Sequence, residues 1–353
     1  MRIHSIYLYR AGPIAERTID LTNSWTGGIH DCVLLTGPNG TGKSTILRAM
    51  SHLWWMVGQW LATPEVRPKG RSESRSWLLD HTKAVGLIVE GVPGIRGKIG
   101  IYFGERASFE KLQSQAEFWM GEFDDLSQGP GRTPLIHRDN FEWMRSWSRA
   151  YKVLRLSSAE SAENGFPTPN MVYLEGEERR WVRPKGNPDQ PVPDDPTLRW
   201  LVTYQPKEGW TGQLEASLVA LKTLDETRYN RVINDLNQFL AGKKIRHQPT
   251  PRLRLMVDVE CPRGEHTLDE LSAGERQVLI QIYLISRWLE PGGLVLLDEP
   301  DLHLHPSLVT MLLGRIEAIT TERRAQLFLT SHLPELWHRY ETKALRVKLG
   351  DDL

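Results

Sequence analysis

The sequence contains a glycine-rich segment whose spacing suits phosphate binding. This segment is Gly37-Pro38-Asn39-Gly40-Thr41-Gly42-Lys43-Ser44, which matches the pattern G-x-x-x-x-G-K-[ST]. Its glycines let successive backbone N–H groups turn toward phosphate oxygens, and a helix that begins near Lys43 adds its positive end. Lys43 can neutralise phosphate charge, and the Ser44 hydroxyl is suited to Mg²⁺. An apolar strand before the segment and an amphipathic helix after it favour this interpretation over a chance glycine turn.

Two acidic residues follow a short apolar run near the other end of the chain. The run Leu294–Leu297 ends in Asp298-Glu299-Pro300. An Asp at the carboxyl edge of a parallel sheet would lie beside the Mg²⁺ that Ser44 holds. The adjacent Glu299 could then polarise a water molecule for in-line attack on the terminal phosphate. Alone, a buried strand that ends in an acid is weak evidence, and the phosphate-binding segment makes it strong.

Two further motifs flank this acidic strand. Leu271-Ser272-Ala273-Gly274-Glu275-Arg276-Gln277 begins the helix before it, and Thr330-Ser331-His332 ends the next strand. Considered separately, the first is an ordinary Ser-capped helix start and the second an ordinary histidine. Their positions relative to the acidic strand favour a functional interpretation.

The four motifs together resemble those of ABC-type P-loop ATPases. The resemblance implies that Ser272 and Gly274 contact the γ-phosphate of ATP held by a second copy of the chain. A homodimer would therefore close on two sandwiched ATP molecules. It also implies a switch histidine, His332. The resemblance covers about residues 1–60 and 255–340 and implies a glutamine between these two ranges, for which Gln205, at the end of the predicted strand 201–205, is the candidate.

The resemblance gives the following expected site. ATP and Mg²⁺ are the cofactors, and Ser44 and Asp298 are the metal ligands. Lys43, Glu299 and His332 form the catalytic set. Residues 37–44 bind nucleotide together with Thr45, Ser272, Gly274 and Gln205.

One segment limits the resemblance to a subgroup of these ATPases. Its sequence is Asp298-Glu299-Pro300-Asp301-Leu302-His303-Leu304-His305-Pro306. It is similar to the DEPExHLHP pattern of stand-alone SMC/RecF-like and OLD-like ATPases in bacterial defence or repair. OLD nucleases carry a nuclease domain after the switch histidine, whereas this 353-residue chain continues for only 21 residues beyond His332. We therefore expect no nuclease domain, and long coiled-coil arms are also absent.

The predicted fold is α/β, an ABC-type ATPase head with a mostly parallel sheet, a helical lobe and an inserted middle region. Residues 1–104 and 251–353 would form the two parts of the ATPase core, and residues 105–250 the lobe and insert. A hairpin is predicted over 85–92 and 98–103, helices over 109–123 and 141–156, and a short strand at 171–174. The final hundred residues predict strands at 253–259, 293–297 and 327–330 and helices at 277–289 and 308–319.

Composition limits the function classes. Lys and Arg number 44 and Asp and Glu also number 44, so the formal net charge is zero. This argues against electrostatic binding of nucleic acid over the whole surface. Two cysteines cannot form a disulfide framework, and no apolar run is long enough to span a bilayer. We expect a cytoplasmic protein with no membrane partner.

The 13 tryptophans are more than such a chain usually carries, and six of them fall in the middle region. Trp181 and Trp210 are flanked by charged residues and glycines, which predicts exposed anchors for a partner protein. One hypothesis is therefore an ATPase that controls a separate effector, a nuclease or toxin, in anti-phage defence. The alternative is a RecF-like ATP-gated DNA-binding protein, since Arg145, Arg149 and Lys152 share one helical face. That face is more typical of an amphipathic helix that buries its aromatic side chains and leaves its basic side chains in solvent.

Overall fold

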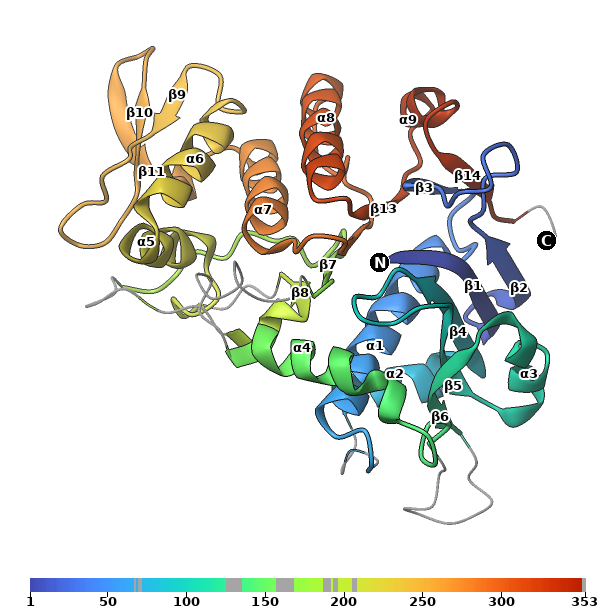
Figure 1. Ribbon diagram of the computed structural model, residues 1–353. Helices are drawn as coiled ribbons and strands as arrows, with labels where there is room; N and C mark the ends of the chain where they lie inside the picture. Colours follow the sequence, from blue (N-terminus) through green and yellow to red (C-terminus); the bar gives the residue numbers. More distant parts are fainter. Residues whose placement is uncertain are drawn as a thin grey trace.

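The computed structural model describes residues 1–66, 68, 72–124, 135–156, 168–186, 192, 196–204 and 208–350. Two large sheets, a smaller third sheet and the surrounding helices make up this part of the chain (Figure 1).

The sheet that carries the phosphate-binding loop is parallel at every strand pair. Successive side chains of its strands enter opposite cores: Val33 and Leu35 belong to one, and Leu34 to the other. Because both faces are covered, the strands are continuous apolar runs rather than alternating ones. In spatial order they are β14 (Leu345–Lys348), β3 (Cys32–Thr36), β13 (Gln326–Thr330), β12 (Leu294–Leu297), β7 (Met171–Leu174) and β8 (Leu201–Thr203).

A second sheet is formed mainly by the first hundred residues. Its strand pairs are antiparallel except for the parallel pair β5 and β6. In order they are β2 (Ile14–Asp20), β1 (Arg2–Ala11), β4 (Ala84–Glu90), β5 (Ile99–Gly104) and β6 (Phe118–Phe123).

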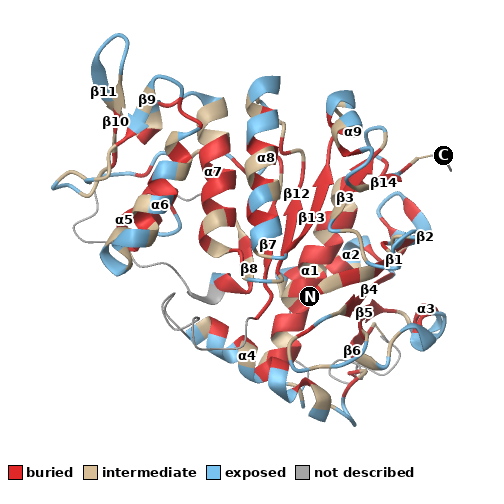
Figure 2. Cartoon of the chain, turned by 45° about the horizontal axis from the view of Figure 1, so that its top comes forward, coloured by how far each residue is buried: buried red, intermediate tan, exposed pale blue. Residues whose placement is uncertain are grey.

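The helix α1 (Lys43–Ala62) joins the two sheets into one core. Met50 and Trp54 of α1 share a hydrophobic cluster with Leu87 of the second sheet and Leu296 of the parallel sheet. The opposite face of the parallel sheet is covered by α7 (Ala273–Trp288), α8 (Pro306–Glu322) and α9 (Pro334–Tyr340). Figure 2 shows the central strands almost wholly buried between these layers.

The third sheet lies beside α5 (Leu214–Leu224) and α6 (Glu226–Asn237), at one end of the molecule (Figure 1). It is antiparallel, with the order β11 (Gly264–Thr267), β10 (Met256–Val259) and β9 (Lys243–Ile245). The other helices of the described residues are α2 (Glu73–His81), α3 (Arg106–Glu110) and α4 (Arg145–Leu156). The described 3₁₀ turns are η1 (Gln113–Gln115), η3 (Glu142–Met144), η5 (Pro196–Arg199) and η6 (Leu268–Glu270).

Most predicted elements are confirmed, including the 85–103 hairpin, the helix that ends at Leu156 and the short strand 171–174. The predicted helix 109–123 is wrong, because its second half is strand β6, which pairs with β5. The predicted strand 253–259 is shorter and begins at Met256. Residues 105–250, predicted as a helical lobe and insert, also supply β6, β7 and β8 to the two large sheets.

Three of the six tryptophans of the middle region are core residues, and the other three are partly buried and pack against a core. Trp147, Trp200 and Trp210 are buried. The predicted exposure of Trp210 is therefore wrong, with only 9% of its surface accessible and the Arg254 guanidinium 5.1 Å from its ring centre. Trp181 is half-buried and its indole N–H donates to Asp269. In both cases the neighbouring charged side chains cover the indole instead of leaving it in water.

Candidate functional site

Most of the predicted site residues directly follow strands of the parallel sheet, at its carboxyl edge. The phosphate-binding loop follows β3, His332 follows β13, and Asp298 and Glu299 follow β12. These three strands are direct neighbours in the sheet. Since carboxyl ends of parallel strands meet at one edge, the topology brings these residues together.

The backbone of the phosphate-binding loop has the conformation that its glycines allow. Gly40 and Gly42 have φ values of 77° and 95°, and a Cβ at Gly42 would lie 2.9 Å from a side-chain carbon of Ile14. The first turn of α1 contains no acidic residue, so its positive end is not neutralised within the helix. A glycine loop at a helix N-terminus that carries no acidic residue in its first turn fits an anionic phosphate group.

Lys43 lies inside this loop. Its ammonium donates to the carbonyl oxygens of Gly37 at 3.0 Å and Pro38 at 2.8 Å. Burial lowers the pKa of Lys43, while the charges of Glu299 and Asp298 act in the opposite direction. The loop thus holds a buried cation, which suits neutralisation of a bound phosphate.

Ser44 and Asp298 are brought together across 254 positions of sequence. The Ser44 hydroxyl donates to Asp298 Oδ1 at 2.9 Å. The buried hydroxyl of Thr330 donates to the same oxygen at 2.6 Å. A hydroxyl and a carboxylate are hard oxygen donors of the kind that Mg²⁺ prefers, so this pair fits the predicted metal.

Glu299 has an unusual backbone conformation. Its φ of 46° lies in the left-handed region, which is uncommon for a residue other than glycine. Its N–H donates to the Thr330 hydroxyl at 2.9 Å, and its carboxylate lies 3.2 Å from Nε2 of His332. Two of the predicted catalytic side chains are therefore in direct contact.

Ser272 and Gly274 begin α7. The Ser272 side chain accepts the N–H of Glu275, and the Glu275 carboxylate accepts the N–H of Ser272 in return, forming a capping box. Lys243 of β9 forms an ion pair with the same carboxylate at 2.9 Å. Among the described residues, no hydrogen bond or ion pair joins Ser272 or Gly274 to the phosphate-binding loop of the same chain.

The predicted glutamine, Gln205, lies outside the described residues. The strand beside β12 is β7 rather than β8, so the residues after Leu174 lie next to the acidic pair. There Glu175 forms an ion pair with Arg48 of α1, and Arg179 is fully buried. Sequence reasoning missed both residues, although Met171–Leu174 is followed by a charged run much as Leu294–Leu297 is followed by Asp298 and Glu299.

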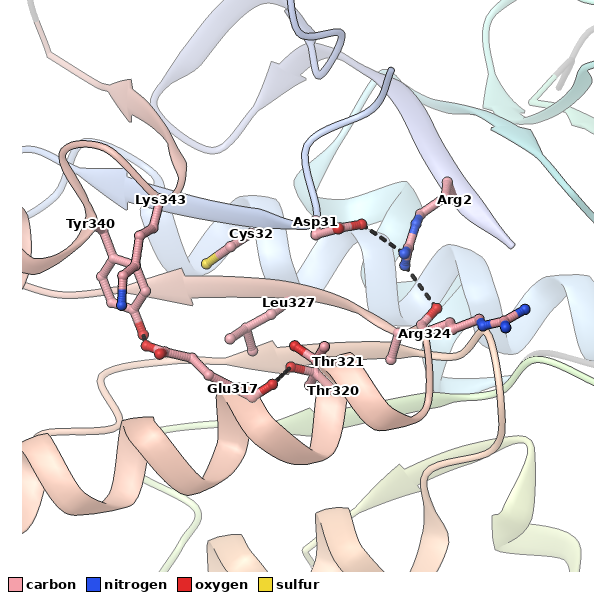
Figure 3. Close-up of a pocket in the computed structure, with 11 residues that line it drawn as sticks. Arg2, Asp31, Cys32, Glu317, Thr320, Thr321, Arg324, Leu327, Tyr340 and Lys343 are labelled. Carbon is pink, nitrogen blue, oxygen red and sulfur yellow. Dashed lines mark hydrogen bonds and ion pairs between the residues drawn. The ribbon is translucent and has the colours of Figure 1, made fainter. Parts of the chain in front are cut away.

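A cavity of about 330 Å³ lies at the opposite edge of the same sheet (Figure 3). Asp31, just before β3, and Leu327, near the start of β13, are among the residues that line it. Asp31 forms an ion pair with Arg2 at 2.6 Å, and the Tyr340 hydroxyl donates to Glu317 at 2.7 Å. None of the predicted site residues lines this cavity.

Comparison with known families matches both ends of the chain. Residues 1–62 match a family described as "AAA domain", and residues 262–337 match one described as "AAA domain, putative AbiEii toxin, Type IV TA system". The first range contains the phosphate-binding loop, and the second contains Ser272, the acidic pair and His332. Both matches support the resemblance to stand-alone P-loop ATPases.

One curated relative is the "Retron Ec83 probable ATPase" of Escherichia coli, with 34% identity over 173 residues. The match covers 42% of this chain and 31% of that protein, so the chain spans about a third of its relative's length. Similar solved structures include the SMC head domain from Thermotoga maritima, with a TM-score of 0.41 and 13% identity over 96% of this chain and 92% of that one. A second is an SMC head bound to the C-terminal winged-helix domain of ScpA, with a TM-score of 0.45 and 12% identity over 94% and 90%.

Within the described part of the chain, no helix is both long and apolar enough to cross a membrane.

Proposed function

We propose that the chain binds Mg²⁺·ATP and hydrolyses its terminal phosphoanhydride bond. The observation that carries this proposal is the 2.9 Å contact between Ser44 and Asp298, next to the buried Lys43. A phosphate-binding lysine and a pair of hard oxygen donors are the parts that phosphoryl transfer to water requires. The family matches at both ends of the chain also support ATPase chemistry.

Each side chain has a role in this proposal. Lys43 and the loop N–H groups bind the phosphates, and Ser44 and Asp298 hold Mg²⁺, which neutralises developing charge when bound. Glu299 orients the attacking water and accepts its proton, and His332 donates to the terminal phosphate. The 3.2 Å contact between Glu299 and His332 supports the proposal that both side chains act at the terminal phosphate.

Nucleotide binding tests the first half of this proposal. Lys43→Ala should abolish ATP binding in equilibrium titration, because it removes the buried cation of the loop. Lys244→Ala is the matched control, since this exposed lysine lies on β9, away from the carboxyl edge of the parallel sheet. Equal ATP affinity in Lys43→Ala and the unmodified protein would contradict the proposed site.

We further propose that two copies close on two ATP molecules, with Ser272 and Gly274 of each copy contacting the nucleotide of the other. Both residues lie at the N-terminal end of α7, which suits an anionic ligand, and Ser272 is exposed. Neither has a hydrogen bond to the described loop of its own chain. Such an interface would be isologous.

Sedimentation of the Glu299→Gln protein tests this dimer, because slow turnover preserves bound ATP. ATP should shift the protein to a dimer, and adding Ser272→Arg should prevent the shift while leaving ATP binding intact. An ATP-bound protein that stays monomeric, or a dimer insensitive to Ser272→Arg, would contradict the trans arrangement.

For the biological role we propose control of a separate effector protein, a nuclease or toxin, in anti-phage defence. The similarity to a retron probable ATPase and to a family whose description mentions a toxin supports this role. Co-expression with the products of adjacent genes, followed by purification with and without ATP, tests it. An ATP-dependent complex with an adjacent nuclease or toxin is the expected result, and no complex with any neighbouring product would contradict it.

An ATP-gated DNA-binding protein is the second candidate, because Arg145, Arg149 and Lys152 of α4 are exposed. Trp147 and Leu154, on the opposite face, are buried, so α4 is also explained as an amphipathic helix that packs on α1. Fluorescence anisotropy with duplex DNA separates these functions. DNA binding that weakens in an Arg149→Glu and Lys152→Glu double variant would favour the second candidate.

A further inference from the structure

Arg179 is a charged side chain in an unusual place. It follows β7 by five residues and none of its surface is accessible. Burial lowers the pKa of Arg179 to about 10, so the guanidinium is charged at neutral pH. A buried charge is costly unless it is fully hydrogen-bonded, so its partners identify what it does.

The guanidinium binds the backbone of the acidic turn. Nη1 donates to the carbonyl oxygens of Asp298 at 2.7 Å and Leu174 at 3.1 Å, and Nη2 donates to that of Glu299 at 2.6 Å. One rigid planar group thus joins the carboxyl ends of β7 and β12.

The remaining side of Arg179 contacts the helix that begins at Ser272. Its Nε donates to Oε1 of Gln277 at 3.3 Å, and the Gln277 amide donates back to the Arg179 carbonyl. Gln281, one turn further along α7, donates to the Pro300 carbonyl at 3.2 Å. The first turns of α7 and the acidic turn are therefore linked through Arg179 and these two glutamines.

This link bears on the strained residue of the site. A left-handed backbone at a residue other than glycine persists only when its surroundings impose it. At Glu299 the N–H is held by Thr330 and the carbonyl by Arg179. The backbone that directs the Glu299 carboxylate toward His332 is therefore fixed from both sides.

We propose that Arg179 is a positioning residue that couples α7 to Glu299, so that contact between Ser272 and a partner's nucleotide is transmitted to the residue that activates water. This proposal rests on the proposed ATPase function. Arg179 itself touches backbone carbonyls and Gln277, and it does not contact the phosphate-binding loop in the described residues. Its loss should therefore slow hydrolysis and leave nucleotide affinity unchanged.

Arg179→Lys tests this coupling, because lysine keeps the charge and cannot donate from a planar fork to three carbonyls. Loss of a charge-assisted hydrogen bond at Glu299 should slow single-turnover ATP hydrolysis about ten- to a hundredfold. ATP affinity should stay at the level of the unmodified protein. Arg180→Lys is the matched control, since the neighbouring Arg180 is exposed and, among the described contacts, its side chain donates only to the Glu177 carbonyl.

A double-mutant cycle distinguishes positioning from general stabilisation. In a Glu299→Gln background, Arg179→Lys should slow hydrolysis no further, because the group it positions is already gone. Equal slowing in both backgrounds, or a parallel loss of ATP affinity, would overturn the proposal. If Arg179→Lys does not fold, Gln277→Leu removes only the link to α7 and is measured in the same cycle. An unmodified protein that binds ATP without hydrolysing it would contradict the proposed function instead.

Discussion

Thr330 offers a sharp test of how the acidic turn is held, because one buried hydroxyl serves two partners. It donates to Asp298 Oδ1 at 2.6 Å and accepts the Glu299 N–H at 2.9 Å. Thr330→Val keeps the shape of the side chain and removes both hydrogen bonds. Thr330→Ser keeps the hydroxyl and removes only a methyl group.

The magnitudes of the two changes differ for a physical reason. A hydrogen bond to a charged group contributes about 1.5 to 3 kcal/mol, and an unpaired buried N–H costs about 1 to 3 kcal/mol. The retained Ser44 contact and the added apolar methyl of valine offset part of this, so Thr330→Val should lower the free energy of unfolding by about 3 kcal/mol. Thr330→Ser should lower it by about 1 kcal/mol, the cost of one buried methyl group.

Urea unfolding of the nucleotide-free proteins, with midpoints compared at equal m-values, measures both changes. ATP turnover should fall in Thr330→Val and be largely kept in Thr330→Ser, because only valine releases the Glu299 backbone. A Thr330→Val protein as stable and as active as Thr330→Ser would refute the role of this hydroxyl.

Two further predictions follow from burial. In the same urea experiment, Trp210→Ala should lower the free energy of unfolding by about 3 kcal/mol. Trp25 is 95% exposed, so Trp25→Ala should change the free energy of unfolding by less than about 0.5 kcal/mol, and equal effects would contradict the burial of Trp210. His137 is buried, its Nδ1 accepts the Gly121 N–H, and desolvation lowers its pKa to about 4. Because its ordinary value is 6.5, the unfolded chain binds a proton between pH 6.5 and 4 that the folded protein does not. As the pH falls from 6.5 to 4, the free energy of unfolding should therefore decrease by an amount on the order of 3 kcal/mol, and the His137→Gln protein should not show this decrease. Parallel pH profiles for the two proteins would contradict this.

The residues that could be predicted from sequence are those whose function requires a fixed local pattern. The phosphate-binding loop needs glycines at set spacings, and the acidic pair needs a buried strand immediately before it. Strand order then brings Ser44 and Asp298 together, as the βαβ pattern predicts.

The features that could not be predicted depend on tertiary contacts. Strand β6 was predicted as helix because its pairing with β5 is not encoded in local periodicity. Arg179 and Arg180 are adjacent and alike in sequence, yet only Arg179 meets the carbonyl groups at the ends of β7 and β12. Trp181 and Trp210 illustrate the same limit, since Arg276 and Arg254 lie over their rings and shield them.

Hydrolysis by Glu299→Gln tests the central claim most directly. Glutamine preserves the size of the side chain and the backbone contacts to Thr330 and Arg179, and it cannot accept a proton from water. In single-turnover measurements with Mg²⁺·ATP, the unmodified protein should hydrolyse ATP, and Glu299→Gln should bind it equally well and hydrolyse it about 10² to 10⁴ times more slowly. Hydrolysis by Glu299→Gln at the unmodified rate would contradict the assignment of Glu299 as the residue that activates water.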